Sequence, residues 1–228
     1  MARTGFFHHL GTFLLFAATV LLIVTCISAP VVNDLAILRV DLGGDNSGGE
    51  QINFGTFGYC LTRPDADDDC SRSRVGYSPA AFLAAVDGTE FSEHAEDTTR
   101  TLTKAMILHP IACGINFIAF LLAVGAGTIG SFFASLVALV AFLATGLACI
   151  IDFVLFGIIR SNANDRGETT GAEAWYGPAA WTILVSAVCS LLGAVIVFFT
   201  CCSARLHRRR GAATKTDYAS PPRRRRFW

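Results

Sequence analysis

Four long apolar stretches constrain the fold of this 228-residue chain more than any other feature of its sequence. They cover roughly residues 10–29, 106–124, 129–151 and 179–200, and none of them contains Asp, Glu, Lys or Arg. A helix needs about 20 mostly apolar residues to cross the hydrocarbon core of a bilayer. We therefore predict an all-α membrane protein, a four-transmembrane-helix bundle, and this layout excludes a water-soluble enzyme.

The first stretch, 10–29, admits two interpretations. Arg3 precedes it, and the small residues Ser28 and Ala29 end it, as in a secretory signal peptide. Its apolar run is longer than the about 7–15 residues usual in the hydrophobic part of a signal peptide. We therefore expect a retained membrane helix.

Lysine and arginine indicate the orientation of the chain, because they gather on the cytoplasmic side of membrane proteins. The last segment, 201–228, holds nine basic residues and one acidic residue, whereas segment 30–104 holds 13 acidic and 6 basic residues. We therefore predict a multi-pass protein with cytoplasmic termini, 1–9 and 201–228, and outer segments 30–104 and 160–178. The third helix is expected to span 129–159 and to extend outside the bilayer.

Two of the eight cysteines, Cys60 and Cys70, lie in the long outer segment, and the others lie in or beside the apolar stretches. Disulfides persist in oxidising compartments, so we predict a bond between these two residues. The alternative is two free thiols. A metal site is disfavoured because no histidine is nearby, and no cofactor is expected.

The outer segment also carries the pattern of a small antiparallel β-sheet, which the disulfide would pin. Residues 35–42 and 51–61 are expected to be strands, and 75–79 a short third strand. A helix is expected to begin at Pro79, with Ser78 as its N-cap. Residues 91–105 are expected to lead helically into the second membrane helix.

The connection 43–50 is rich in turn residues and is interpreted as a solvated loop. Cation binding through Asp45, Asn46 and Glu50 is the alternative. The acidic run that ends at Cys70 is likewise interpreted as a solvated loop tip, with binding of a cation or a wall polymer as its alternative. Its acidic residues are Asp65, Asp67, Asp68 and Asp69.

Several short motifs, in this order and spacing, resemble the fungal pali family of four-span membrane proteins. The group includes the PalI pH-response regulators and the Sur-type eisosome proteins. The matching stretches are ISAP at 27–30, INFGTFGYC at 52–60, Cys70, VGYSP at 75–79, LTKAMILHPIACG at 102–114 and IDFVLFGIIR at 151–160. Within the second stretch the motif residues are Asn53, Phe54, Gly55, Phe57, Gly58 and Tyr59.

The resemblance implies a plasma-membrane protein without catalytic residues. In the pH-response branch it would assist a multispan ambient-pH sensor at the cell surface. In the eisosome branch it would occupy stable membrane domains linked to endocytosis and cell-wall organisation. The architecture is also remotely similar to claudins, but the tryptophan of the claudin motif is absent, so junction or pore function is not inferred.

Two functions of other classes remain as alternatives. A small-solute transporter or channel would need polar residues at mid-span, and the apolar stretches offer only Asn116 and a few serines and threonines. A membrane enzyme would need a cluster of His, Cys and acidic residues in the outer segments, and the sequence offers none.

Charged residues near the outer ends of the second and third helices are candidates for an interhelical polar pair. Lys104 lies 23 residues before residue 127 of the short GAG turn, and Asp152 lies 25 residues after it. Similar distances from the turn predict similar heights, so we expect a structural ion pair between them, with a functional switch as the alternative.

Histidine titrates near neutral pH, which makes His109 and His94 candidates for pH-responsive residues. His109 precedes Pro110, which removes one helical hydrogen bond and can kink the helix. The structural interpretation of His109 is a bond to a neighbouring helix.

The start of the last segment carries candidates for contact with the inner leaflet. Cys201 and Cys202 stand beside the membrane, where S-palmitoylation occurs. Arg205, Arg208, Arg209 and Arg210 follow, and such clusters attract anionic lipids. Lipids, other membrane proteins and a second copy of the chain are therefore the expected partners, and nucleic acid is not expected.

Overall fold

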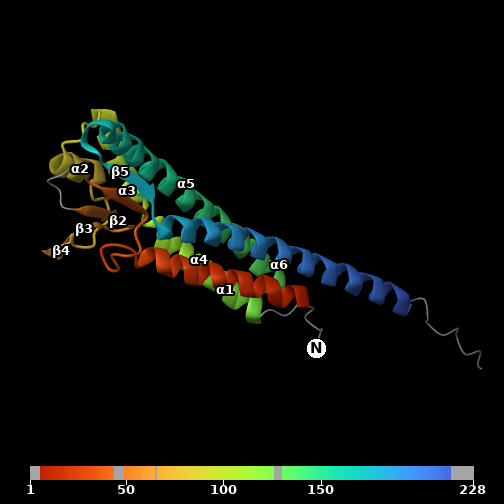
Figure 1. The fold of residues 1–228 in the computed structure, drawn as a ribbon. Coiled ribbons are helices and arrows are strands. Elements are labelled where there is room, and N and C mark those ends of the chain that lie inside the picture. The colour runs from red at the N-terminus through yellow and green to blue at the C-terminus, as the bar shows by residue number, and fades with distance from the viewer. Residues whose placement is uncertain (1–5, 44–48, 65, 126–129, 217–228) are drawn as a thin grey trace, which may run out of the picture.

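The computed structural model describes residues 6–43, 49–64, 66–125 and 130–216, and it has an elongated helical body with a small sheet at one end (Figure 1). Four long helices form the body: α1 Phe6–Cys26, α4 Leu108–Gly125, α5 Gly130–Thr170 and α6 Pro178–Thr216. All four are long and apolar enough to cross a membrane. The predicted fold class is confirmed.

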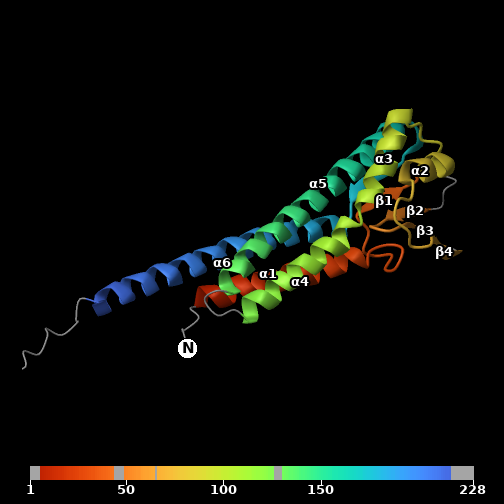
Figure 2. The same ribbon diagram turned by 180° about the vertical axis from the view of Figure 1, so that it is seen from behind.

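The four long helices pack in a ring in which α1 contacts α4 and α6, and α5 contacts the same two (Figure 2). Large apolar side chains point outward along the ring, as expected of a surface that faces lipid. Small residues allow close approach inside it. A Cβ at Gly11 would lie 2.9 Å from Cγ2 of Ile196, and one at Gly193 would lie 3.0 Å from Leu15.

A buried polar layer ties three of the helices together at mid-height. The Asn116 amide donates to Thr145 Oγ1 over 2.9 Å, and Ser190 Oγ donates to Asn116 Oδ1 over 2.9 Å. All three side chains are fully buried. Hydrocarbon offers no alternative partners, so these bonds serve helix packing. Asn116, the polar residue that a transport pathway would need, is already bonded within the bundle.

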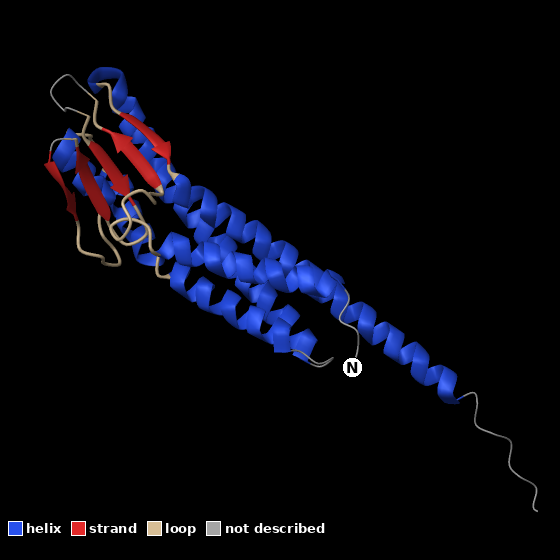
Figure 3. Ribbon diagram, turned by 60° about the horizontal axis from the view of Figure 1, so that its bottom comes forward, coloured by secondary structure: helices blue, strands red, loops and turns tan. Residues whose placement is uncertain are grey.

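Five antiparallel strands form the sheet, in the order β4-β3-β2-β1-β5 (Figure 3). Their bounds are β1 Leu38–Asp41, β2 Gln51–Phe54, β3 Tyr59–Arg63, β4 Ala66–Cys70 and β5 Glu173–Tyr176. Strand β5 comes from the short segment between α5 and α6 and pairs with β1. The sheet therefore joins both segments that the sequence predicted to face outside.

Several sequence-based boundaries differ from the structure. Residues 51–61 form a hairpin of two strands, because a turn closed by Gly55 N donating to Gly58 O over 2.8 Å divides them. Residues 75–79 are not a strand but lead into α2 Pro79–Asp87. Strands β4 and β5 were not predicted. The third long helix continues to Thr170, so much of the expected loop 160–178 is helical.

Two shorter helices, α2 and α3, pack beside the sheet at the end where it meets the bundle. Helix α2 begins at Pro79 as predicted, although the Ser78 side chain makes no capping bond, and it ends at Gly88, where φ is 66°. Helix α3, Glu93–Ala105, is capped by the Ser92 side chain and leads into α4. The predicted helical approach to the second membrane helix is confirmed.

The sheet with α2 and α3, named the ectodomain here after the orientation that the sequence predicts, shares one apolar core with the adjoining part of α5. Phe54, Tyr77 and Leu83 are buried there with Leu155 and Phe156 of α5. The rings of Tyr59 and Phe82 stack at 3.7 Å between centroids. The sheet is therefore held against the bundle by hydrophobic burial as well as by polar contacts.

The Cys60–Cys70 disulfide joins β3 to β4 at paired positions of the sheet and confirms the predicted bond. Strand β4 is the edge of the sheet and all five of its residues are exposed. The disulfide therefore pins an acidic strand that buries little surface of its own.

Some predicted residues lie outside the described part of the chain. These are Asp45, Asn46, Asp65, the turn residues 126–129 and the segment 217–228. Cys201 and the arginines at 205 and 208–210 belong to α6, but their side chains are not described.

Replacing Cys60 and Cys70 together by serine should lower the free energy of unfolding of the ectodomain by about 2–3 kcal/mol, the chain-entropy value for a bond across ten residues. Denaturant unfolding of purified protein, followed by tryptophan fluorescence, measures this change. Cys202→Ser, which alters an exposed free thiol outside the ectodomain, is the control. Equal stability of the double variant and this control would contradict a stabilising role for the disulfide.

Candidate functional site

The strongest candidate site is the junction where the turn between β2 and β3 meets the ends of α1 and α6. Thr56, at the tip of this turn, is buried. Its hydroxyl donates to the Thr25 carbonyl over 2.9 Å, and its backbone N–H donates to Ser28 Oγ over 3.0 Å. The Thr25 hydroxyl lies 2.9 Å from that of Thr182 in α6. The turn therefore completes hydrogen bonds at the end of α1, and Thr25 links that end to α6.

Two glycines allow the turn to approach the segment after α1. A Cβ at Gly55 would lie 2.1 Å from the Ala29 carbonyl oxygen, and one at Gly58 would lie 2.4 Å from Ser71 Oγ and 3.0 Å from Pro30. At Gly55 the overlapping atom belongs to the backbone and cannot turn aside, so only glycine fits there, whereas a Cβ at Gly58 would first require the Ser71 hydroxyl to move. The motifs ISAP and INFGTFGYC are therefore the two surfaces of one contact.

Tyr77 connects this turn to α3. Its hydroxyl donates to the Gly55 carbonyl over 2.7 Å, and its own carbonyl accepts from Thr103 Oγ1 over 2.7 Å. Burial raises the pKa of the Tyr77 phenol well above its usual value, and Asp152 and Tyr59 add to the rise. The phenol therefore remains protonated and continues to donate.

His109 lies at the connection between α3 and α4. In a regular helix the Met106 carbonyl would accept from the N–H of residue 110, but Pro110 has none. That carbonyl accepts instead from the His109 backbone N–H over 3.0 Å, and Nδ1 of the His109 ring lies 3.0 Å from the same oxygen. Both contacts of the Met106 oxygen at the bend in the chain therefore come from His109.

The other ring nitrogen of His109 contacts Asp152 of α5, with Nε2 2.9 Å from Oδ2. His109 is fully buried and Asp152 is 1% exposed. The second carboxylate oxygen, Oδ1, is buried and has no hydrogen-bond partner among the described residues. A buried ionisable pair therefore links α4 and α5 beside the junction.

The predicted partnership of Asp152 with Lys104 is wrong. Lys104 is exposed on α3, and the carboxylate pairs with His109 instead. The prediction counted residues along one straight helix, but α3 ends at Ala105 and α4 begins at Leu108, so Lys104 belongs to a different helix from His109. Counting residues compared only Lys104 with Asp152 and left out His109, which is the residue that reaches the carboxylate.

The remaining candidates lie apart from the junction. His94 and Asp67–Asp69 are exposed, on α3 and β4 respectively, and Cys202 is exposed on α6. Glu50, proposed as a cation ligand, forms an ion pair of 2.9 Å with Arg63. Among the described residues no cluster of three or more His, Cys, Asp or Glu could hold a metal ion.

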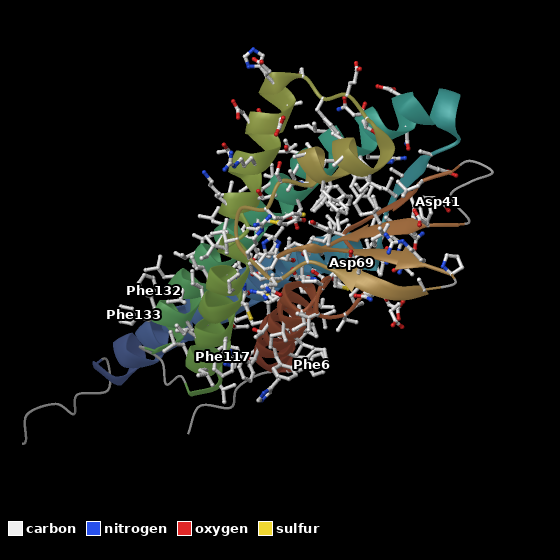
Figure 4. The ribbon with its side chains drawn as sticks, turned by 90° about the vertical axis from the view of Figure 1, so that its left-hand side faces the viewer. Phe6, Asp41, Asp69, Phe117, Phe132 and Phe133 are labelled. Carbon is white, nitrogen blue, oxygen red and sulfur yellow. A yellow bond between two sulfur atoms is a disulfide. The ribbon has the colours of Figure 1, made fainter. Side chains whose placement is uncertain are left out.

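Among the described residues, exposed acidic side chains gather at the sheet end, whereas exposed phenylalanines lie along the long helices. Figure 4 shows Asp41 and Asp69 on the sheet, and Phe6, Phe117 and Phe132 toward the other end of the bundle. There an apolar groove of about 380 Å³ runs between α5 and α6, lined by residues such as Leu136, Leu139 and Leu191. This end of the bundle therefore offers a surface for hydrocarbon, not for a polar ligand.

Comparisons with known proteins identify relatives of this chain. The model of the SUR7/PalI family matches residues 7–196, most of the chain. A Neurospora crassa protein named pH-response regulator protein palI/prr-5 is 33% identical over 113 residues. The uncharacterized membrane protein TOS7 of Saccharomyces cerevisiae is 27% identical over 156 residues, and the pH-response regulator protein palI/RIM9 of Pyricularia oryzae is 28% identical over 113 residues.

The matches cover different shares of the proteins. They include 49% of this chain for the Neurospora protein, 62% for the yeast protein and 50% for the Pyricularia protein. The same matches cover only 14%, 25% and 14% of those relatives. The chain therefore matches only a small part of the length of these relatives, and most of each relative lies beyond the match.

The Gly55→Ala variant should lose at least about 3 kcal/mol of stability, the upper part of the range for overpacking, because its methyl group would overlap the Ala29 backbone. Denaturant unfolding of the purified protein measures the loss. Gly114→Ala is the matched control, because a Cβ there meets nothing within 4 Å. A Gly55→Ala variant as stable as this control would contradict the close contact.

The Tyr77→Phe variant should lose about 1–3 kcal/mol, because the buried Gly55 carbonyl loses its donor. The raised pKa means that the phenol bond is fully present below the unfolded value of about 10 and is lost only as pH rises through the higher folded value. The difference from wild type should therefore stay constant between neutral and mildly alkaline pH in denaturant unfolding. The Tyr176 hydroxyl makes only a long contact of 3.5 Å, so the control variant Tyr176→Phe should lose less stability than Tyr77→Phe.

Proposed function

Because the chain belongs to the SUR7/PalI family, we propose that it is a non-enzymatic plasma-membrane protein that assists ambient-pH signalling at the fungal cell surface. The match of residues 7–196 to the family model carries this proposal, together with relatives that are named pH-response regulators. Its natural partner in that role is a multispan pH sensor in the same membrane.

The described architecture suits an accessory role. The polar groups of the bundle, such as Asn116 and Ser190, are bonded to one another, and the ectodomain is fixed on the bundle by the turn around Thr56. We therefore propose that the chain presents a rigid outer surface to its partner, not a transport pathway or a catalytic centre.

The distribution of basic residues supports the proposed orientation. The sheet and the basic part of α6 lie at opposite ends of the molecule (Figure 1). Positive residues favour the cytoplasmic side, so the sheet would face outside and both termini would be cytoplasmic. In this orientation the ectodomain meets the ambient medium.

Lipids are the second proposed partner. The apolar groove between α5 and α6 lies on the membrane-spanning part of these helices, and α6 continues into the segment with Arg205 and Arg208–Arg210. Acyl chains fit the groove, and anionic headgroups complement the arginines. Contact with another membrane protein or a second copy through the same face is the competing use.

Deletion of the gene in the fungus that encodes this chain should impair growth at alkaline pH more than growth at acidic pH. Colony growth on buffered media measures the effect, and re-expression of the full chain should restore it. A fluorescent fusion should mark the cell surface.

A normal alkaline response of the deletion strain would contradict the proposal. If the fusion then lay in stable surface patches, the role of an eisosome-type organiser of membrane domains would replace it. The Gly114→Ala chain should restore growth as wild type does, which makes it a suitable expression control.

A further inference from the structure

We propose that His109 and Asp152 form a buried binding site for a single proton, and that this proton keeps the ectodomain docked on the bundle. Docked means that the turn 55–58 lies against Ala29 and is bonded to the end of α1. The inference deepens the proposed role in pH signalling and rests on it for its biological purpose. The physical argument depends only on the geometry of the pair.

The surroundings of His109 determine which ring nitrogen carries a hydrogen. Nδ1 lies 3.0 Å from the Met106 carbonyl, which can only accept, so Nδ1 is a donor. The same oxygen also accepts from the His109 backbone N–H over 3.0 Å, and its two lone pairs allow both bonds. Nε2 is therefore the nitrogen at which protonation can vary.

The contact between Nε2 and Asp152 Oδ2, at 2.9 Å, requires a proton between the two atoms. Either a charged imidazolium donates to the carboxylate, or a carboxylic acid donates to the neutral imidazole. Both arrangements hold one proton more than a neutral histidine beside an ionised aspartate. Without that proton, two lone pairs face each other and the carboxylate is left as a buried charge.

Among the described residues, no lysine or arginine forms an ion pair with Asp152, whose ion-pair partner is His109. The Asp152 carboxylate acts electrostatically on Cys26 of α1, Tyr77 of the ectodomain and Cys149 of α5, none of which is a cation. Helices α1 and α4 contain no Asp, Glu, Lys or Arg, and neither does α6 up to Thr200. The nearest cation predicted from the sequence, Lys104, is exposed on α3 and does not pair with Asp152.

The second carboxylate oxygen supports the same conclusion. Oδ1 of Asp152 is buried without a hydrogen-bond partner in the described chain. An ionised carboxylate accepts several hydrogen bonds when it is stable inside a protein, and this one receives at most the bond from His109. Loss of the shared proton should therefore open the site to water.

The pair is connected to the turn through a short series of hydrogen bonds. His109 donates to Met106, which is buried in the core below the sheet. One turn earlier in α3, Thr103 donates to Tyr77, whose hydroxyl donates to Gly55. Movement at the pair therefore shifts the connection between α3 and α4, and with it the support of the turn.

The direction of the pH effect follows from counting protons. The docked state holds one proton on the pair, whereas an exposed histidine and aspartate have both lost theirs in mildly alkaline solution. Opening thus releases one proton, so docking is complete at low pH and weakens as pH rises. Opening here means that the turn leaves its docked position. Its equilibrium constant should increase about tenfold per pH unit in the range where opening releases the proton.

Hydrogen–deuterium exchange of the intact protein in lipid nanodiscs tests this inference. The Thr56 amide donates to Ser28 Oγ in the docked state, so a peptide covering 52–60 contains an amide that reports docking. After correction for intrinsic exchange, wild-type protection should fall about tenfold per pH unit between about pH 7 and about pH 9.

Asp152→Asn is the decisive variant. The asparagine amide can donate to Nε2 permanently and so replaces the shared proton. In this variant the peptide 52–60 should be protected from exchange at every pH as strongly as it is in the wild-type protein at low pH. Thr145→Val, which alters the buried polar layer elsewhere in the bundle, should keep the wild-type pH slope whatever its stability.

Two results would overturn the proposal: wild-type protection that is independent of pH, or an Asp152→Asn variant with the wild-type slope. Should this variant fail to fold, infrared difference spectra of the wild-type protein between acidic and alkaline pH decide the matter. They should contain carboxyl and imidazole bands from the pair, and the absence of such bands would also refute the site.

The proton site and the signalling role can fail separately. A normal alkaline response of the deletion strain, with a pH slope in wild-type exchange, would leave the site standing and remove its signalling purpose. An impaired response of the deletion strain, with exchange that does not depend on pH, would refute the site and leave the proposed function intact.

Discussion

The contact of the turn 55–58 with Ala29 is the interaction on which the rest of the ectodomain depends. It sets the position of the hairpin β2–β3, and the strands on either side are placed by pairing with that hairpin. Tyr77, just before α2, is then able to reach Gly55. Thr103 of α3 bonds to Tyr77 in turn, so the turn is also linked to the helix that precedes the second membrane helix.

Polar side chains inside a membrane bundle cannot bond to water when they lose a partner, so each must find its hydrogen-bond partners within the protein. Asn116, Thr145 and Ser190 satisfy one another without charge, and they can do so at any ambient pH. His109 and Asp152 achieve the same only by sharing a proton. Two polar contacts of similar length therefore differ in kind: the first stabilises the bundle, and the second makes its outer end sensitive to proton loss.

The sequence predicted those parts of the structure that depend on local composition. The four membrane helices follow from charge-free stretches, and the disulfide follows from Cys60 and Cys70 in an outer segment. Strand β5 was missed because its partner, β1, is more than 130 residues away, so pairing rather than pattern makes it a strand. The partner of Asp152 was missed because a break in the helix before Leu108, invisible to residue counting, determines which side chain reaches it.

His109 joins two parts of the chain through its two ring nitrogens. Its backbone N–H and its Nδ1 both lie 3.0 Å from the Met106 carbonyl oxygen, at the connection between α3 and α4. With Nδ1 held there, Nε2 is directed at α5, where Asp152 lies. With the sheet outside, as the basic residues of the termini predict, this pair lies at the end of the bundle closest to the ambient medium. A change in external pH would therefore reach the pair from the nearer end of the bundle.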